Sequence, residues 1–576
     1  MIVKLISVSG LLAVLLRAAI LCFLTIAVGG IVFLLLVARP KHLQQETWLR
    51  PAARLIRFSA LGLAFSQLLF VLSNILVLTA TTNLSVGQSL GANYVLAAAL
   101  AISAGLTLFF WPGGLRDANL SCLIPAGVMI AALVMTSHAA SRMQDRFALC
   151  AITTVHYVVT AAWIGGLPFL LLVLKNINDL DVVAGISRRF SKLAQVSVTA
   201  LFLAGIGLSL KYVGSWDAIY GTSYGAMVIT KLIFFGCLLL LGTANFFLVR
   251  AMGSHLSDAD TKVSLLRFAE VELGIGITVI LAAASLTSQP PGVDLPQDRA
   301  TLHEIVTRYA LRMPQFSSPD SKELSESATE VGRSAKADGQ KLPPAFVPGD
   351  PGLDVDTPAD MAWSEYNHTW AGVQVLAIGV FALLSRSRYF KWAKAWPLLF
   401  LGLAVFVFLR SDPENWPVGP RGFWGSFAAP DVLQHRVAVI LLIAFAIFQW
   451  RVETGKVQSR FAALVFPAVC ALGGIVLLTH SHGFNNVKQS LLIELSHTPL
   501  AICAVIAGWS RWLEIRLPQS NPTRRYLAWV WPMCFILIGL ILLNYHEADK
   551  PLLAVIPRAG MHASVSAQPW DLRLRQ

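Results

Sequence analysis

The chain has 576 residues, of which 56% are hydrophobic and only 13% are charged, and its mean hydropathy is +0.64. Soluble globular proteins carry about a quarter of their residues as charged side chains, so this composition excludes that class. The formal net charge of +13 does not indicate nucleic-acid binding, because Lys and Arg are concentrated in short loops between apolar runs. The sequence therefore predicts a multi-pass membrane protein whose surroundings are the lipid bilayer.

Apolar runs recur along the whole chain, and a run of about 20 residues is long enough to cross a bilayer as a helix. We predict about fourteen such segments, eight before a long polar insert and six after it. They span roughly 14–38, 58–82, 93–112, 121–139, 147–174, 193–213, 225–249, 268–288, 367–385, 395–411, 435–450, 461–480, 490–510 and 526–545. The first run is too long for the core of a signal peptide and lacks a small-residue cleavage site, so we expect a permanent helix.

The insert divides the predicted helices into two modules. We expect an N-terminal eight-helix module at 1–290, an insert rich in Pro and Ser at 291–364, a C-terminal six-helix module at 365–545 and a tail at 546–576. A short amphipathic helix is predicted around Leu302–Leu311, and the rest of the insert is typical of a flexible linker. The fold class is therefore an all-α polytopic membrane protein in two modules joined by a flexible insert.

Basic residues are concentrated in alternate connections between the predicted helices. These residues are Arg39, Lys41, Arg50, Arg54, Arg57, Lys175, Arg188, Arg189, Lys192, Arg386, Arg388, Lys391, Lys394, Arg511, Arg516, Arg524 and Arg525. Loops rich in Lys and Arg face the cytoplasm, so both termini and the insert are expected to face outward.

Several histidines then fall in the outer half of the membrane. Ionisable groups are costly in a bilayer, and neutral imidazole is the commonest metal ligand, so their convergence predicts an outer metal site. The residues are His138 and His156 in the first module and His368, His435, His480, His482 and His497 in the second. Imidazole suits copper, zinc, iron and nickel alike, so the ligand type leaves the metal open.

Other side chains extend this prediction. Met135 lies three residues before His138, on the same face if one helix continues through both, and its thioether favours Cu(I). Lys231, Asn245 and Glu272 lie within predicted helices and are candidates for a transport path, with Glu272 expected at the cytoplasmic start of its helix. The seven cysteines show no CxxC spacing, which argues against a disulfide framework, and each is most simply a small hydrophobic residue.

Signatures of nucleotide hydrolysis are missing from the sequence. There is no GxxxxGK[ST] loop and no Asp-Lys-Thr-Gly phosphorylation motif. We therefore expect no enzymatic activity, and any transport would be driven by a gradient or by ligand exchange.

The first half resembles the bacterial copper resistance D family over roughly 130–290. The resemblance rests on His156-Tyr-Val-Val-Thr-Ala-Ala-Trp163-Ile-Gly165-Gly166-Leu167, Arg188-Arg189-Phe190-Ser191, Tyr224-Gly225 with Lys231, Asn245 and Glu272. The second half resembles the extension of long members at Tyr366-Asn367-His368, Arg410-Ser411-Asp412-Pro413, Gly422-Phe423-Trp424, Gln434-His435-Arg436, His480-Ser481-His482 and His497-Thr498-Pro499-Leu500. The resemblance implies a bacterial inner-membrane protein that moves copper ions from periplasm to cytoplasm, often beside a periplasmic copper-binding partner.

Two alternatives belong to other classes. Histidine pairs such as His482 with His497, or His138 with His156, are also suitable as axial ligands of a haem in a membrane oxidoreductase. The near absence of histidine from the inner leaflet argues against haems at both membrane faces. A third hypothesis is a membrane anchor that senses copper without transporting it.

Overall fold

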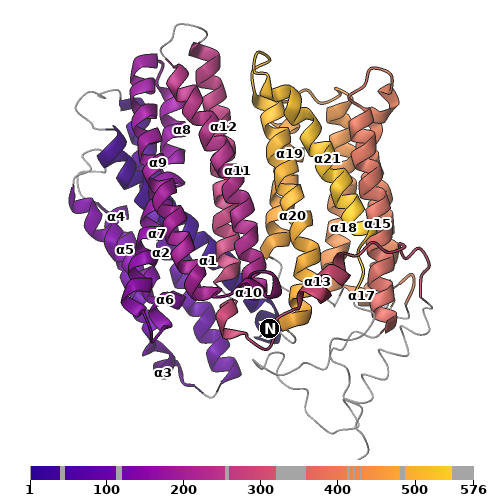
Figure 1. The fold of residues 1–576 in the computed structure, drawn as a ribbon, viewed down its shortest axis with the longest axis horizontal. Coiled ribbons are helices and arrows are strands. Elements are labelled where there is room, and N and C mark those ends of the chain that lie inside the picture. The colour runs from indigo at the N-terminus through magenta and orange to yellow at the C-terminus, as the bar shows by residue number, and fades with distance from the viewer. Residues whose placement is uncertain are drawn as a thin grey trace, which may run out of the picture.

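The computed structural model describes residues 2–38, 46–82, 84–111, 120–252, 258–287, 289–319, 358–411, 416–419, 422–427, 430–479 and 487–547. These residues form helices and their connections, with no strand among them, as the predicted all-α class requires. The long helices run side by side, with those of the first module on one side of the molecule and those of the second on the other (Figure 1).

The first module contains nine helices that run along the bundle and three short connecting helices. The long elements are α1 (Ile2–Val32) with a π-helical continuation (Phe33–Ala38), α2 (Glu46–Thr81), α4 (Asn93–Phe109), α5 (Leu123–Met135), α7 (Arg146–Trp163), α8 (Leu167–Asn176), α9 (Leu180–Tyr212), α11 (Ser223–Ala251) and α12 (Asp258–Leu286). The connecting helices are α3 (Val86–Leu90), α6 (His138–Ser141) and α10 (Trp216–Gly221).

The second module is built from α15 (Pro358–Leu384), a 3-10 segment (Lys391–Leu398) leading into α16 (Leu399–Arg410), the short α17 (Phe423–Ser426), α18 (Pro430–Glu453), α19 (Val465–Thr479), α20 (Val487–Arg516) and α21 (Thr523–Leu543). Across the described residues, ten helical stretches are long and apolar enough to span a membrane, so the protein is a multi-pass membrane protein. The remaining predicted segments correspond to α4, α5 and α19, which are apolar but shorter, and to α20.

Basic residues from three of the loops predicted to be cytoplasmic meet at one end of the bundle. Glu270 of α12 accepts hydrogen bonds from Arg267, from Arg516 and from the Trp512 indole, and Lys175 lies 3.9 Å away. Since Arg516 and Trp512 belong to α20, this network joins the two modules. A second carboxylate at this end, Glu514, pairs with Arg386, which follows α15, and with Arg511.

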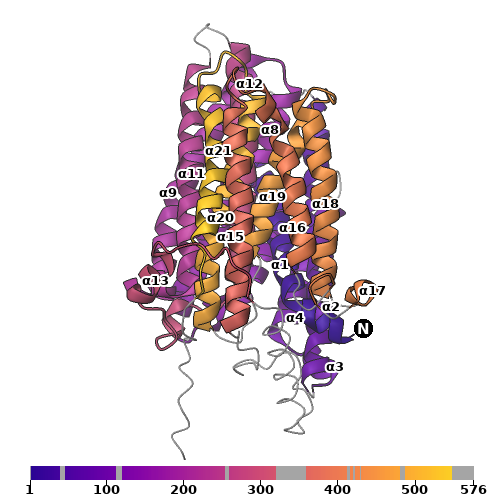
Figure 2. The ribbon, with the colours of Figure 1, turned by 90° about the vertical axis from the view of Figure 1, so that its right-hand side faces the viewer.

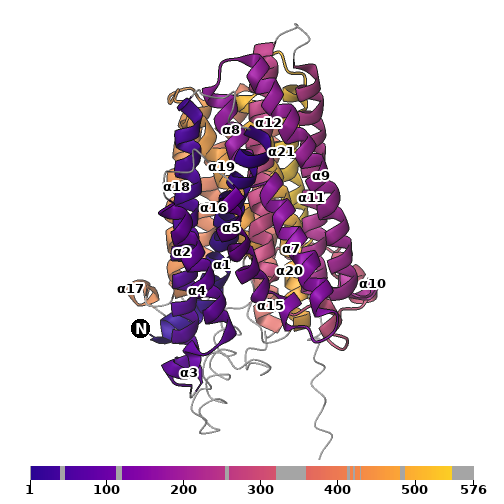
Figure 3. The ribbon, with the colours of Figure 1, turned by 90° about the vertical axis from the view of Figure 1, so that its left-hand side faces the viewer.

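The opposite end carries α3, α10 and α13 (Leu302–Tyr309): α3 and α13 lie there in Figure 2, and α3 and α10 in the view from the other side (Figure 3). Thr301 and Glu304 form a capping box that starts α13, in agreement with the predicted helix in the insert. Arg308 donates to the Ser496 hydroxyl at 3.2 Å, and the Tyr309 hydroxyl donates to the Leu495 carbonyl, so α13 packs on α20.

The insert is therefore not a linker over its whole length. Ala300 is buried, and Arg299 pairs with Asp217 at 2.5 Å, so the chain just before α13 is fixed against the first module. In the stretch before α13, Arg299 also donates to the Ser215 hydroxyl at 3.0 Å, so this part of the insert is packed against the first module. Residues 320–357 lie outside the described ranges.

The modules are packed closely enough to require glycine at their contact. A Cβ atom at Gly274 of α12 would collide with the indole of Trp509 on α20. Leu513 of α20 and Leu517 just after this helix belong to the same hydrophobic core as Leu265 and Ala269 of α12. One continuous core thus joins the two modules.

Gly165 illustrates the same close approach within the first module. A Cβ atom there would overlap the Thr25 carbonyl of α1 and approach the Ala161 carbonyl of α7. Backbone atoms cannot move aside as a side chain can, so we expect Gly165→Ala to destabilise the protein by about 1–3 kcal/mol. Gly236→Ala is the matched control, because nothing lies within 4 Å of the position a Cβ would take. Thermal unfolding of the purified variants in detergent measures the difference, and equal stability of the two variants would contradict this packing.

Candidate functional site: an intramembrane polar pocket and an outer histidine pair

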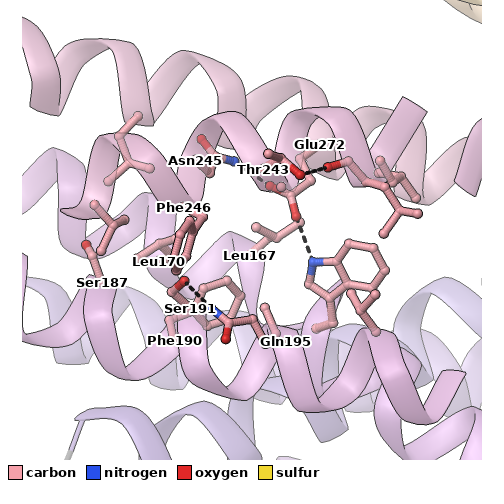
Figure 4. Close-up of a pocket in the computed structure, with 18 of the residues that line it drawn as sticks. Leu167, Leu170, Ser187, Phe190, Ser191, Gln195, Thr243, Asn245, Phe246 and Glu272 are labelled. Atoms are coloured by element: carbon pink, nitrogen blue, oxygen red, sulfur yellow. Dashed lines mark hydrogen bonds between the residues drawn. The ribbon is translucent and has the colours of Figure 1, made fainter. Parts of the chain in front are cut away.

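The first module encloses a pocket of about 400 Å³ between α8, α9, α11 and α12 (Figure 4). Much of its wall is apolar, with Leu167, Leu170 and Phe190 among the lining residues. The polar lining residues are Ser187, Ser191, Gln195, Thr243, Asn245 and Glu272. Polar groups gathered inside an apolar helix bundle indicate a functional site.

A break between two helices places Trp163 at this pocket. Helix α7 ends at Trp163, and α8 begins at Leu167 after Gly165-Gly166, with Pro168 at its second position. Pro is favoured in the first turn of a helix, where its missing N–H leaves no hydrogen bond unmade. The break that Gly165-Gly166 and Pro168 predict is therefore present, and Trp163 at its edge is almost fully buried.

Glu272 is the charged residue of the pocket and is only 3% exposed. The Trp163 indole Nε1–H donates to its Oε1 at 2.7 Å, and the Asn245 Nδ2–H donates to its Oε2 at 2.5 Å (Figure 4). Both donors are neutral, and no basic side chain of the described residues pairs with Glu272. A carboxylate buried within a membrane without a counter-ion is costly, so its retention indicates a functional role.

The depth of Glu272 differs from the prediction. The sequence placed it at the cytoplasmic start of a helix beginning near residue 268, whereas α12 begins at Asp258. Glu272 is therefore fourteen residues into the helix, which is about 21 Å along its axis and near the middle of the apolar stretch Ala259–Leu286. The first turns of α12 contain charged residues, so the apolar run in the sequence begins later than the helix does.

The lining of the pocket favours hard ions. It contains no His, Cys or Met among its residues, and its polar atoms are carboxylate, amide and hydroxyl groups. The Asn245 side chain contributes a further oxygen to the pocket, since its Oδ1 is buried there and is not used in a hydrogen bond. Such groups suit protons and hard cations better than Cu(I), which prefers sulfur. The pocket therefore supplies negative charge and polarity at mid-membrane and lacks soft ligands.

The outer end of the second module brings together two of the predicted metal ligands. His368 of α15 and His497 of α20 lie edge to face, with their ring centroids 5.8 Å apart. Tyr545, just after α21, stacks on His368 at 3.8 Å and lies 6.0 Å from His497. Three segments far apart in the sequence thus form one aromatic and imidazole cluster, here called the outer histidine pair.

Hydrogen bonding sets the tautomer of His368. Its Nδ1 lies 2.8 Å from the Ser364 carbonyl oxygen, which only accepts, so Nδ1 carries the proton. The lone pair is then on Nε2, which is the arrangement usual for a metal-binding histidine. Burial is the main cause that raises the pKa of Tyr545 well above its usual value, so this phenol stays neutral beside the pair.

His138 lies apart from this pair, in the first module. It begins α6, its ring centroid is 6.2 Å from that of Tyr212, and its Nε2 is buried without a hydrogen-bond partner. Burial, followed by the charges of Arg17 and Arg142, lowers the pKa of His138 below its usual value. Neutral imidazole is the metal-binding form, so this environment keeps His138 able to bind a metal. The two guanidinium groups, however, repel an incoming cation.

Met135 does not share a helix with His138. Helix α5 ends at Met135, Ser137 is extended with φ −86° and ψ 162°, and α6 starts at His138. The prediction that the two side chains lie on one helical face is therefore wrong. Met135 is instead 42% exposed.

His156 and Lys231 are near neighbours inside the first module. His156 lies on α7 beside Tyr157, with ring centroids 6.4 Å apart, and its Nδ1 is buried without a partner. Lys231 of α11 is close enough to act on His156 electrostatically.

The remaining predicted ligands are placed as follows. His435 lies half-buried near the start of α18, and His480 and His482 lie outside the described residues. Within the described ranges no group of three or more His, Cys, Asp or Glu side chains is assembled as a metal site. Of the five histidines predicted to converge, contact is seen for His368 and His497.

Two contributors were not among the predicted site residues. Trp163 appeared in the sequence only as part of the family-like stretch, and its donation to Glu272 required the fold. Tyr545 follows the last predicted helix and gave no signal of its own, although its position after α21 places it beside the outer ends of α15 and α20.

The sequence was compared with family models and known proteins. Residues 184–286 match the family model for copper resistance protein D. Comparisons with curated proteins and with solved structures gave no match. The matched residues contain most of α9 and all of α11 and α12, and hence Asn245 and Glu272, so the family domain supplies most of the pocket wall.

Proposed function

Because the chain carries a copper resistance protein D domain at residues 184–286 and is a multi-pass membrane protein, we propose that it transports copper across the bacterial inner membrane, from periplasm to cytoplasm. The observation that carries the proposal is the membrane-buried Glu272, which lies inside the matched domain with no counter-ion. A cation crossing an apolar layer of about 30 Å needs compensating charge within it.

Each group of site residues has its own role in the proposed transport. The outer histidine pair captures the ion, with His435, His480 and His482 as further ligands. His138, Met135 and His156 form a second station in the first module, and Lys231 beside His156 adjusts its charge. Asn245 and Glu272 compensate the cation at mid-membrane before release inward.

Delivery and orientation complete the proposal. We assign the end that carries α13 to the periplasm, with both termini there, because the opposite end gathers Lys175, Arg386, Arg511 and Arg516. A periplasmic copper-binding protein is then the expected donor, since the outer histidine pair lies near that surface.

Uptake of isotopic copper into proteoliposomes tests the function. Vesicles with the protein should accumulate copper above protein-free vesicles. Copper binding without accumulation would indicate the sensing anchor instead. A strong Soret band in the absorption spectrum of the purified protein would indicate the haem alternative.

Reporter fusions test the orientation. A cytoplasm-specific reporter fused at Leu180, the first residue of α9, should be active, and the same reporter at Val331 in the insert should be inactive. A periplasm-specific reporter should show the reverse pattern. The same signal at both positions would overturn the topology, and a fully inverted pattern would overturn the assignment of the periplasmic end.

Acid should weaken copper binding, but unequally among the sites. An ordinary histidine protonates near pH 6.5 and then cannot coordinate, so most binding should be lost at about pH 5.5. The pKa of His138 is lowered by burial and by Arg17 and Arg142, so its imidazole stays neutral to a lower pH. The binding that survives at about pH 5.5 should therefore decrease in His138→Ala, while binding at neutral pH changes little. Residual acid-stable binding of equal size in His138→Ala would exclude this role.

A further inference from the structure

Three cysteines in the second module converge on one core. Cys470 of α19, Cys503 of α20 and Cys534 of α21 pack in the cluster formed around Trp531, Phe466 and Phe535. All three are free thiols. They are separated by 33 and 31 residues, so no local spacing reveals them in the sequence.

Two of these thiols are in direct contact. The side chains of Cys503 and Cys534 share a hydrogen bond, and Cys470 is close enough to act on Cys534 electrostatically. Cys534 is 6% exposed, and the ring neighbours Trp531, Phe466 and Phe535 keep the surroundings apolar. A pair of soft sulfur atoms held together in a dry site is the ligand set that Cu(I) prefers.

The site also lies on the helices that carry the outer histidine pair. Cys503 is six residues from His497 on α20, which is about 9 Å farther along the helix axis, away from the outer end. Cys534 is eleven residues before Tyr545, on the helix that leads to the same cluster. Toward the basic end, the Trp531 indole donates to Glu514 of the ion-pair network at 3.0 Å.

We propose that Cys503 and Cys534 form a Cu(I) site inside the second module, with Cys470 as a neighbouring third thiol. The proposal rests on the proposed copper transport for its choice of ion. Binding replaces one thiol proton: Cu⁺ joins the two sulfur atoms, one S–H bond is broken, and the proton leaves. One positive charge enters and one leaves, so the apolar site gains no net charge, and no electron is transferred.

In the proposed transport, Cys503 and Cys534 are the next soft ligands for a copper ion that leaves the outer imidazoles. The pocket around Glu272 offers only hard ligands, whereas the sulfur pair offers soft ones at intermediate depth. Two coordinating sulfurs are sufficient for Cu(I), so the pair does not require the three-residue assembly that the described residues lack.

The test uses the full-length protein in detergent, without oxygen, titrated with Cu(I) against a chromogenic chelator. X-ray absorption of the loaded protein should show sulfur around copper. Cys503→Ser and Cys534→Ser should each weaken the affinity of this site by about a hundredfold and remove the sulfur signal. Cys22→Ser on α1 is the matched control, since this cysteine lies outside the cluster, and it should leave both unchanged.

A methionine variant separates ligation from folding. Cys534→Met keeps a soft sulfur and should retain part of the affinity that Cys534→Ser loses. If Cys534→Met binds no better than Cys534→Ser, or if wild-type copper is bound by nitrogen and oxygen alone, the sulfur site is overturned. His497→Ala should abolish uptake while preserving the sulfur signal. Normal uptake without a sulfur signal would overturn this site and leave the transport function standing. A sulfur signal without uptake would support the site and overturn transport.

Discussion

His497→Ala is expected to abolish copper capture at the outer end of the second module, and His368→Ala should do the same. The two rings touch each other and share Tyr545, so they form one site rather than two. Removing either imidazole breaks the pair and leaves copper with fewer neutral ligands, so the ion is held more weakly. The expected loss in affinity is about a hundredfold, and initial uptake at low copper should fall with it.

The substitution should leave the fold intact, because His497, in the first half of α20, is half-buried and outside the hydrophobic core. His303→Ala is the matched control: His303 is an exposed histidine of α13 at the same end of the molecule. Equilibrium copper binding and uptake are measured on the same preparations. Unchanged binding in both His368→Ala and His497→Ala would make the pair structural and remove the entry site proposed here.

A variant of Tyr545 distinguishes ring packing from metal binding in the same cluster. Tyr545→Phe keeps the ring that stacks on His368 and removes only the hydroxyl. Because the phenol is neutral, it is not required as an anionic ligand, so copper binding should be retained. The contrast between this variant and His368→Ala separates packing of the ring from ligation by imidazole.

The helices were predictable because apolar length and loop charge act locally along the chain. The basic loops indicated which helix ends lie together, and Lys175, Arg516 and Arg386 do gather at one end. Boundaries were less predictable where a helix begins in polar sequence. Helix α12 gains ten residues before 268 because Leu265 and Leu266 bury against neighbours, although charged residues surround them.

The candidate site was predictable only in part, because contacts between distant segments depend on how helices cross. His368 and His497 were recognised by their place at the outer ends of apolar runs, and they meet. Met135 and His138 were joined by spacing along a helix that in fact ends between them. The Cys503–Cys534 contact carries no sequence signal, since each residue resembles an ordinary small hydrophobic side chain.

The charge at mid-membrane and the ligands at the outer end make separable contributions. In the proposed transport, the outer imidazoles determine how tightly copper is held before it enters. Glu272 contributes no bond at that point, because it lies near the middle of α12. Its effect is therefore expected on the rate of passage and not on capture.

Glu272→Gln is accordingly expected to leave copper binding close to wild type and to slow inward transport by about tenfold or more. Glutamine has the same shape, and its oxygen accepts the Trp163 indole N–H as the carboxylate does. The Asn245 amide reverses so that its oxygen accepts from the new NH₂ group. The fold and both hydrogen bonds are thus retained, and the negative charge alone is lost.

Two further variants separate charge from hydrogen bonding at this position. Glu272→Asp keeps the charge on a shorter side chain and should retain more transport than Glu272→Gln. Trp163→Phe removes one donor but keeps the charge, and its effect should be smaller than that of the glutamine variant. Uptake into proteoliposomes and equilibrium binding are measured together for each. Transport at the normal rate in Glu272→Gln would show that no charge is needed in the pocket. The path of copper would then run through the second module alone, past the histidine pair and the two thiols.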